Sequence, residues 1–160
     1  MSKYHMKKQD RQISDSGEIA EILQKGRYTV IAMCRDNEPY IVTLSYGYDK
    51  AGNALYFHTA KSGLKLDFIS RNPEVCAAVI DDKGYIMNEC AHEYRSVVLN
   101  GRMSIVDKLE EKKHGMEILL KHLEDTPGIM KEKHFMNDNI YENFVILKLD
   151  ITDITGKKGR

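Results

Sequence analysis

The spacing of hydrophobic residues changes from one segment of the chain to the next. These changes predict the order of the helices and strands. Between Asp15 and Gly26 the apolar residues recur at helical spacing, which predicts a short amphipathic helix that begins near Asp15. Runs rich in β-branched and aromatic residues then predict three strands, at residues 28–34, 40–46 and 54–58. Only short turns separate these runs, so we expect an antiparallel meander, because parallel strands need longer crossovers.

Helical spacing returns twice in the rest of the chain. It predicts one helix from about Ser62 to Arg71 and a longer amphipathic helix from Leu109 to Leu123. Further strands are predicted at residues 75–80, 96–106 and 143–152. Gly101 lies within a run that is long for one strand, which predicts a bulge or bend there. The Lys-, His- and Met-rich stretch after Gly128 has no clear period and receives no assignment.

Six strands with about three helices, joined mostly by short turns, predict a mostly β fold with flanking helices (α+β). The arrangement expected is a closed or nearly closed, six-stranded antiparallel barrel. Residues 1–12 are polar and are predicted to form a flexible N-terminal arm. Residues 13–160 are predicted to form a single domain, because the chain is long enough for one core and too short for two.

Charge and apolar content exclude several classes of protein. Lys and Arg together number 24, as do Asp and Glu, so a nucleic-acid-binding function is not expected. No apolar run approaches the roughly 18 residues of a membrane span, and the first residues lack an apolar signal core. Cys34, Cys76 and Cys90 have no C-x-x-C spacing, and the first two are expected to be buried thiols. These features favour a cytoplasmic protein without a metal site.

The segment from His58 to Lys65 has the composition of an anion-binding turn. A predicted strand ends at His58 and a predicted helix begins near Ser62, where unpaired backbone N–H groups and the helix dipole favour an anion. Thr59 and Ser62 add hydroxyl groups, and Lys61 and Lys65 add positive charge. Gly63 would allow close approach of a ligand. The alternative is an ordinary helix start with exposed lysines. If the segment is considered alone, this alternative is the favoured interpretation.

Other candidate groups are scattered. His58 is the one candidate for a chemical role, although a histidine at a strand end is more often structural. Cys90, His92 and Glu93 form a weak metal-binding pattern that a surface loop explains better. The residues Tyr94-Arg95-Ser96 combine an aromatic ring, a guanidinium and a hydroxyl that suit a planar ligand or its phosphate, with ordinary surface residues as the alternative. Nucleophile-elbow, Walker and dinucleotide-binding motifs are absent from the sequence.

Six collinear segments carry a resemblance to a known family. They read D-R-x-I-x-D from Asp10, P-Y-x-V-x-x-x-Y-x-Y from Pro39, L-Y-F-H-x-A-x-x-G-x-K from Leu55, N-P-x-V-C from Asn72, Y-x-S-V-x-x-x-G from Tyr94 and I-x-x-I-T-G-K from Ile151. With these motifs the chain resembles the FMN-binding split-barrel superfamily. Within it, the chain is most similar to the pyridoxamine-phosphate-oxidase-like branch that contains the nitroimidazole-resistance proteins.

This resemblance implies a six-stranded split barrel that binds FMN, and a homodimer with each FMN at the subunit interface. The residues implied along the isoalloxazine ring are Val42, Thr43 and Leu44, and those implied around the phosphate are His58, Thr59, Lys61, Ser62, Gly63 and Lys65. Tyr94, Arg95 and Ser96 are implied around the same cleft, from the same subunit or from its partner. Thr43 stands where many relatives carry proline, which bears on the ring contacts more than on flavin binding.

The function expected from the resemblance is a flavin-dependent oxidoreductase that acts on a small substrate, such as a nitroaromatic compound. Pyridoxamine-phosphate oxidase activity itself is not predicted, because the chain lacks the more basic phosphate cluster and the C-terminal substrate segment of the true oxidases. An alternative is a flavin- or haem-binding carrier or sensor without catalytic turnover. A third possibility is a barrel that binds no cofactor.

Overall fold

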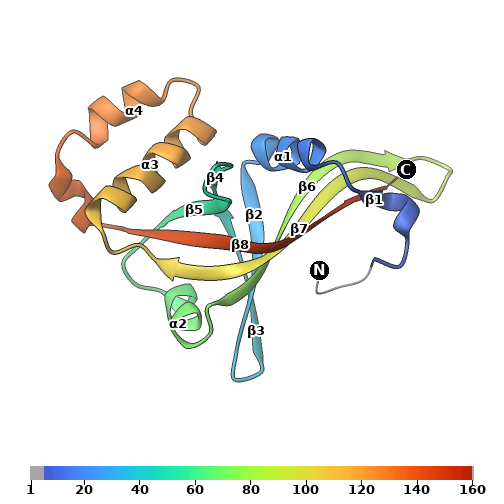
Figure 1. The fold of residues 1–160 in the computed structure, drawn as a ribbon, viewed down its shortest axis with the longest axis horizontal. Helices are drawn as coiled ribbons and strands as arrows, with labels where there is room; N and C mark the ends of the chain where they lie inside the picture. Colours follow the sequence, from blue (N-terminus) through green and yellow to red (C-terminus); the bar gives the residue numbers. More distant parts are fainter. Residues whose placement is uncertain (1–5, 160) are drawn as a thin grey trace.

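The computed structural model describes residues 6–159, and their strands and helices follow one another along a strongly twisted antiparallel sheet (Figure 1). The strands are β1 (Gln12–Ile13), β2 (Tyr28–Arg35), β3 (Glu38–Ser45), β4 (Gly47–Asp49), β5 (Ala54–Thr59), β6 (Glu74–Ile86), β7 (Ala91–Ile105) and β8 (Val145–Lys158). The helices are α1 (Ser16–Lys25), α2 (Leu64–Arg71), α3 (Leu109–Leu123) and α4 (Pro127–His134). Short 3-10 helices are η1 (Gln9–Arg11) and η2 (Asp138–Glu142).

The sheet runs in the order β3-β2-β6-β7-β8-β5-β4, with β1 paired to β8. Its two ends approach each other where β3 contacts β5, but no hydrogen-bonded ladder joins these strands. The sheet is therefore a barrel that stays split at this seam, as the family resemblance implies. The predicted count of six strands is wrong, because the described residues form eight; β1 and β4 are too short to leave a strand pattern.

The predicted meander is also wrong beyond its first hairpin. β2 and β3 pair across a two-residue turn, where Asp36 and Asn37 adopt φ of 46° and 64°. Two consecutive positive φ values match the twist of a hairpin, and Asp and Asn tolerate them. β5, however, pairs with β4 and β8 instead of β3. The reason is burial on both faces, since Leu55, Tyr56 and Phe57 are all shielded from solvent.

The bulge predicted at Gly101 is confirmed. The β7–β8 register shifts between Asn100, which pairs with Asp153, and Gly101, which pairs with Ile151, so the extra residue is Thr152 of β8. A side chain at Gly101 would run into the carbonyl oxygen of Asp150, so only glycine allows the two backbones to come this close.

Two apolar cores lie on opposite faces of the strands. The larger fills the barrel interior and includes Ile31, Phe57, Phe68, Leu99, Leu147 and Leu149, which are all fully buried. The smaller lies between α3 with η2 and the outer face of β5 and β8, and includes Ala54, Tyr56, Met116, Leu119, Tyr141 and Ile146. Gly115 lets α3 pack closely there, because a Cβ atom would lie 2.7 Å from the Tyr56 ring.

The outer face of β2, β3, β6 and β7 is bare, in contrast to the outer face of β5 and β8. Cross-strand pairs on it are Ala32 with Ile41, Val30 with Ala78, and Ala78 with Val98. The large apolar side chains exposed on this face are Tyr28, Ile41, Ile80 and Val98. Cys34 is exposed and Cys76 half-buried on the same face, so the prediction that both are buried is wrong for the single chain.

The helices predicted before and after the strands are confirmed with small shifts of boundary. Asp15 is the N-cap of α1 and accepts hydrogen bonds from the N–H groups of Gly17 and Glu18. α3 has the predicted bounds, and α2 begins at Leu64, two residues later than expected. The unassigned stretch after Gly128 contains α4 and η2. Within residues 6–159, no helix is long and apolar enough to cross a membrane.

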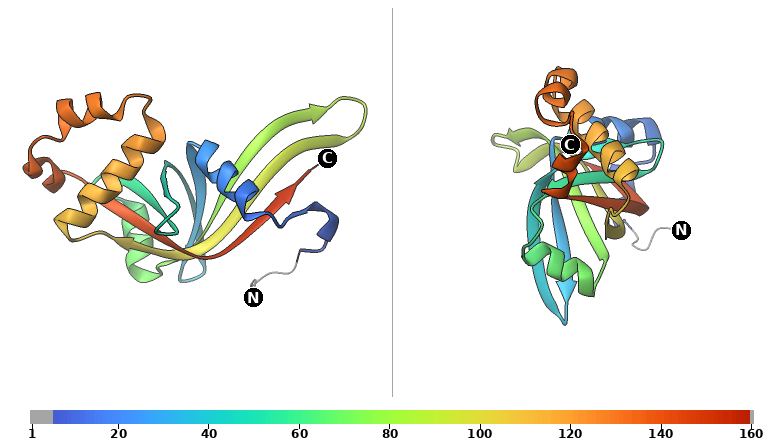
Figure 2. Two further views of the ribbon diagram at one scale, coloured as in Figure 1. Left: turned by 45° about the horizontal axis from the view of Figure 1, so that its top comes forward. Right: turned by 90° about the vertical axis from the view of Figure 1, so that its left-hand side faces the viewer.

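The arm predicted over residues 1–12 falls partly on residues 1–5, which lie outside the described residues. Its remainder includes η1 and the start of β1, where Gln12 pairs with Lys157. The single domain from residue 13 stays a prediction. The β6–β7 hairpin extends from one end of the molecule, and α3 and α4 lie at the other end (Figure 2).

Candidate functional site

A cleft of about 420 Å³, here called the inner cleft, lies where the covered and bare parts of the outer sheet surface meet. Thr43, Leu44 and Ser45 line it from β3, and His58 lines it from β5. Its remaining wall is mostly apolar and comes from the helices, including Met116, Leu119, Leu120, Leu123, Met130 and Phe135. The structure therefore brings the predicted ring-contact residues Thr43 and Leu44 together with His58. Val42 does not line this cleft, and its side chain packs against the barrel interior.

His58 lies at the edge of the α3 cover, against an aromatic neighbour. Its ring centroid is 4.5 Å from that of Phe144, with an angle of 68° between the two planes. Burial lowers the pKa of His58 below its usual value, even though part of the side chain is open to solvent. The neutral imidazole is therefore favoured near neutral pH, and it has one donor and one acceptor nitrogen.

The turn between β5 and α2 has the features of an anion site. Gly63 is the N-cap of α2 at φ 149°, a conformation that favours glycine, and no side chain caps this helix start. A Cβ atom at Gly63 would meet only the Nζ atom of Lys65, at 3.9 Å, so that ammonium group lies beside an open backbone surface. Lys61 and Ser62 are exposed nearby. Thr59 is buried on the face of β5 opposite to His58.

Tyr94, Arg95 and Ser96 lie on β7, far from the inner cleft of the same chain. Arg95 pairs with Lys158 across the sheet, and His58 with Ile146. These two β8 residues are twelve positions apart, which is about 40 Å along an extended strand. One chain therefore does not bring Tyr94, Arg95 and Ser96 to His58.

Acidic neighbours already surround the Arg95 guanidinium. It lies 2.7 Å from Asp81, 3.2 Å from Glu21 and 3.5 Å from Glu18. The hydrogen bond from Arg95 is the main cause that lowers the pKa of the Asp81 carboxyl, although that residue remains partly open to water. These contacts link α1 to the β6–β7 hairpin, which gives Arg95 a structural role within its own chain.

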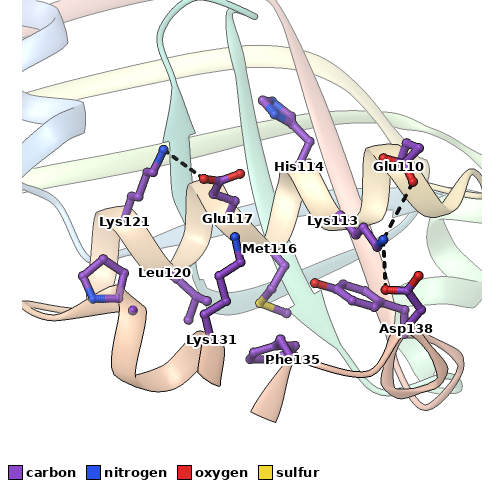
Figure 3. Close-up of a pocket in the computed structure, with 13 residues that line it drawn as sticks. Glu110, Lys113, His114, Met116, Glu117, Leu120, Lys121, Lys131, Phe135 and Asp138 are labelled. Carbon is purple, nitrogen blue, oxygen red and sulfur yellow. Dashed lines mark ion pairs between the residues drawn. The ribbon is translucent and has the colours of Figure 1, made fainter. Parts of the chain in front are cut away.

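A second and larger cleft, here called the outer cleft, has a volume of about 640 Å³ and lies between α3 and α4 (Figure 3). Its floor is apolar and aromatic, with Met116, Leu120, Phe135 and Tyr141. Charged side chains of α3 surround the floor and are mostly paired, as the dashed lines in Figure 3 show for Lys113 and Lys121. Sequence reasoning missed this cleft because α4 has no buried residue, and therefore no apolar stripe to find.

Two further histidines of α3 hold that helix to the sheet. Nε2 of His114 lies 2.8 Å from Oδ2 of Asp49. Desolvation alone would raise the pKa of Asp49, but hydrogen bonds from His114 and from the Gly52 N–H hold the pKa of Asp49 below its usual range. Nδ1 of His122 accepts a hydrogen bond from the backbone N–H of Tyr48, at 3.3 Å. Neither histidine shows a sequence pattern that points to these contacts.

Comparison with known proteins places this arrangement in a family. A family model described as pyridoxamine 5'-phosphate oxidase matches residues 15–158, which is nearly the whole chain. The chain belongs to that family. One curated relative, an uncharacterized protein of Rhizobium meliloti (strain 1021), is 32% identical over 81 residues. The aligned part covers 51% of this chain and 48% of the relative, so the match spans about half the length of each protein.

Solved structures of the same fold include three with informative descriptions. A candidate 5-nitroimidazole antibiotic resistance protein of Bacteroides thetaiotaomicron is 22% identical, with a TM-score of 0.79 over 92% of this chain and 86% of that one. The flavocytochrome Anf3 of Azotobacter vinelandii is 16% identical, with a TM-score of 0.81 over 97% and 72%. The FAD and heme binding protein of Mycobacterium smegmatis is 17% identical, with a TM-score of 0.78 over 94% and 74%. At these identities the likeness establishes the fold.

Proposed function

We propose that this protein binds FMN and works as a homodimeric, flavin-dependent oxidoreductase on a small substrate such as a nitroaromatic compound. The observation that carries the proposal is the joint position of the inner cleft and the β5–α2 turn. His58 lines the inner cleft at one end of this short segment, and Lys65 lies beside the Gly63 backbone at its other end. A flat ring system in the cleft and a phosphate at the turn would then belong to one molecule.

The turn fits a phosphate for physical reasons. The first N–H groups of α2 have no side-chain cap, and the helix dipole places partial positive charge there. Lys65 adds a full positive charge beside Gly63, and Lys61 and Ser62 are exposed close by in the chain. Of the proposed set, Thr59 is the residue that fits least well, because its side chain is on the buried face of β5.

The inner cleft fits an isoalloxazine ring. Its apolar wall from α3 and α4 can cover one face of a planar ring, and Thr43, Leu44 and Ser45 line the β3 side, where their backbone and hydroxyl groups provide polar contacts. His58 in its neutral form can donate or accept one hydrogen bond at the ring edge. When bound, the flavin supplies the electron-transfer chemistry, and the protein supplies binding, orientation and exclusion of water.

A homodimer is supported by the bare sheet face of β2, β3, β6 and β7. Ile41, Ile80 and Tyr28 are each more than 60% exposed on this face, which is unusual for large apolar side chains gathered on one surface. Thr43 and Ser45 lie on the same face and also line the inner cleft. A second copy that covers this face would therefore border the cofactor, and its β7 is the proposed source of Tyr94, Arg95 and Ser96.

The cofactors of proteins with the same fold support a redox cofactor. The relatives named above include a flavocytochrome and an FAD- and heme-binding protein, which supports flavin binding but leaves haem as a second candidate. The candidate nitroimidazole resistance protein supports a nitroaromatic substrate. We place the protein in the cytoplasm, because none of its three cysteines forms a disulfide.

A visible spectrum of the protein as purified tests this proposal. Bound flavin gives an absorbance maximum near ~450 nm and bound haem an intense Soret band, so one spectrum separates the two cofactors. If the protein is isolated without cofactor, titration with FMN should quench flavin fluorescence to a stoichiometry of one per chain. Colourless protein that binds no FMN on reconstitution would overturn the proposal.

A further inference from the structure

The outer cleft is separated from the inner cleft only by side chains that belong to both. Met116, Leu120 and Phe135 line the two clefts alike. None of these three side chains carries a charge, so the partition between the clefts is apolar throughout. A molecule in the outer cleft would therefore lie one side chain away from the inner cleft.

Aromatic rings form a continuous row across this partition. Tyr141 lines the outer cleft, and its ring centroid is 6.0 Å from that of Phe135. Phe135 is 6.2 Å from Phe144, and Phe144 is 4.5 Å from His58 in the inner cleft. Phe144 is buried and lines neither cleft, but Tyr141 and Phe135 line the outer cleft, and Phe135 and His58 line the inner one. Aromatic rings attract other planar rings by stacking and edge-to-face contact, so both clefts offer such contacts to an aromatic ligand.

The charges around the outer cleft are mostly neutralised by one another. Lys113 lies 2.9 Å from Asp138, and Lys121 lies 3.1 Å from Glu117. His114 is held by Asp49, which is not part of the cleft lining. Lys131 is the third lysine of the lining, and with Glu110 the cleft holds three lysines and three carboxyl groups. The lining therefore has no net charge to attract a charged ligand, whereas an uncharged ligand does not depend on this balance.

We propose that the outer cleft binds a planar, uncharged aromatic molecule and delivers it to the inner cleft past Phe135. The identity of the inner cleft as the flavin site rests on the function proposed above, but binding in the outer cleft does not depend on it. If a second copy covers the bare sheet face beside Thr43 and Ser45, the α3–α4 side is the approach that remains open. α4 has no buried residue, so its side chains are open to solvent along this approach.

Gly128 allows a direct test, because it lines the outer cleft and not the inner one. No atom lies within 4 Å of where its Cβ would be, so Gly128→Trp can place an indole in the cleft without a backbone clash. Ile129→Trp is the matched control, since Ile129 is the next residue of α4, is 62% exposed and lines neither cleft. Lys131→Trp, from the next turn of α4, is a second way to fill the outer cleft.

The experiment measures the binding of two probes, nitrobenzene and its anionic analogue 4-nitrobenzoate, by calorimetry with and without FMN. The wild type and Ile129→Trp should bind nitrobenzene at least about tenfold more tightly than 4-nitrobenzoate. Gly128→Trp and Lys131→Trp should lose at least about tenfold in nitrobenzene affinity, with the FMN dissociation constant unchanged. Circular dichroism spectra and unfolding curves that match the wild type show, independently of FMN, that the variants are folded.

Two results would overturn the proposal. One is nitrobenzene binding by both tryptophan variants as tight as that of the wild type. The other is 4-nitrobenzoate binding to the wild type as tightly as nitrobenzene. If the wild type binds no FMN, the proposed flavin function fails, but the probe titrations without FMN still decide whether the outer cleft is a binding site.

Discussion

The Nε2 atom of His122 lies 2.6 Å from the carbonyl oxygen of Gly26, where α1 passes into β2. Its Nδ1 atom accepts from the Tyr48 N–H, so the ring is neutral and donates through Nε2 to Gly26. Next to it, the Arg27 guanidinium donates to the carbonyl oxygen of Leu123 at 2.6 Å. The end of α3, which borders the inner cleft, is thus held by hydrogen bonds from the His122 and Arg27 side chains to backbone groups.

Stability should therefore decrease in mild acid. Burial is the main cause that lowers the pKa of His122 in the folded protein, and Arg27 adds to it, against a hydrogen bond to Gly26 that raises it. The unfolded chain takes up the proton more readily, so the free energy of unfolding falls as pH decreases through the ordinary value of 6.5 towards the folded pKa. His58 contributes in the same direction.

His122→Gln tests this dependence. The variant should lose about 1 kcal/mol of stability at pH 7.5, because glutamine does not reproduce both hydrogen bonds. Its free energy of unfolding should also decrease less between pH 7.5 and pH 5 than that of the wild type. Urea unfolding at each pH measures this difference. His134→Gln, on the exposed face of α4, is the control and should follow the wild-type profile. An unchanged profile in His122→Gln would contradict the assignment.

Lys65→Glu should weaken FMN binding by about 1.5–3 kcal/mol, because it removes a charge-assisted contact to the phosphate at the start of α2. Fluorescence titration with FMN measures the effect, which should diminish as salt concentration rises. Lys50→Glu, in the exposed turn before β5, makes the same change of charge away from the site and should leave the affinity near its wild-type value. Unchanged FMN affinity in Lys65→Glu would remove this lysine from the phosphate site.

Ile80→Lys should weaken the proposed dimer at least about tenfold, since it places a charge in the centre of the bare sheet face. Light scattering after size-exclusion chromatography over a range of concentrations measures the dissociation. Ile129→Lys is closely matched, because Ile129 is 62% exposed and Ile80 64%. Reaction of Cys34 with a thiol reagent should become faster in Ile80→Lys as the face is uncovered. A wild type that is monomeric at all concentrations would refute the dimer.

Gly101→Ala should destabilise the protein by about 1–3 kcal/mol, because the new methyl group would press on the Asp150 carbonyl and on Leu149 at 2.8 Å. Thermal or urea unfolding measures the change. Gly128→Ala is the opposite case, in a helix and with open space around it, and should raise stability by about 0.5–1 kcal/mol. Equal stability of the two variants would mean that β7 and β8 can separate at the bulge.

Local patterns were enough to predict most elements, but pairing between distant segments was not visible in them. The bounds of α3 and the bulge at Gly101 follow from periodicity and from a single residue type. The sequence of β5 does indicate its place: Leu55-Tyr56-Phe57 is a continuous apolar run, typical of a strand covered on both faces. Such a strand needs cover on both faces, which the bare outer face of the β2–β3 hairpin does not offer.

The residues of the candidate site also differ in whether the sequence alone could predict them. The β5–α2 turn was recognisable because its residues are consecutive in sequence. The contacts of Arg95 were not, because its partners Asp81 and Glu21 are 14 and 74 residues away. The wall formed by α4 left no pattern, since an exposed helix has no apolar face to repeat.

The 14-residue strand β8 has a consequence for how the protein is made. It is hydrogen-bonded to β1, β5 and β7, and without it β1 has no sheet neighbour and β5 is held only by the three-residue β4, within the described residues. A nascent chain therefore cannot complete its sheet until residues 145–158 have left the ribosome. Until then the apolar surfaces of β5 and β7 stay open, and this is the interval in which aggregation competes with folding.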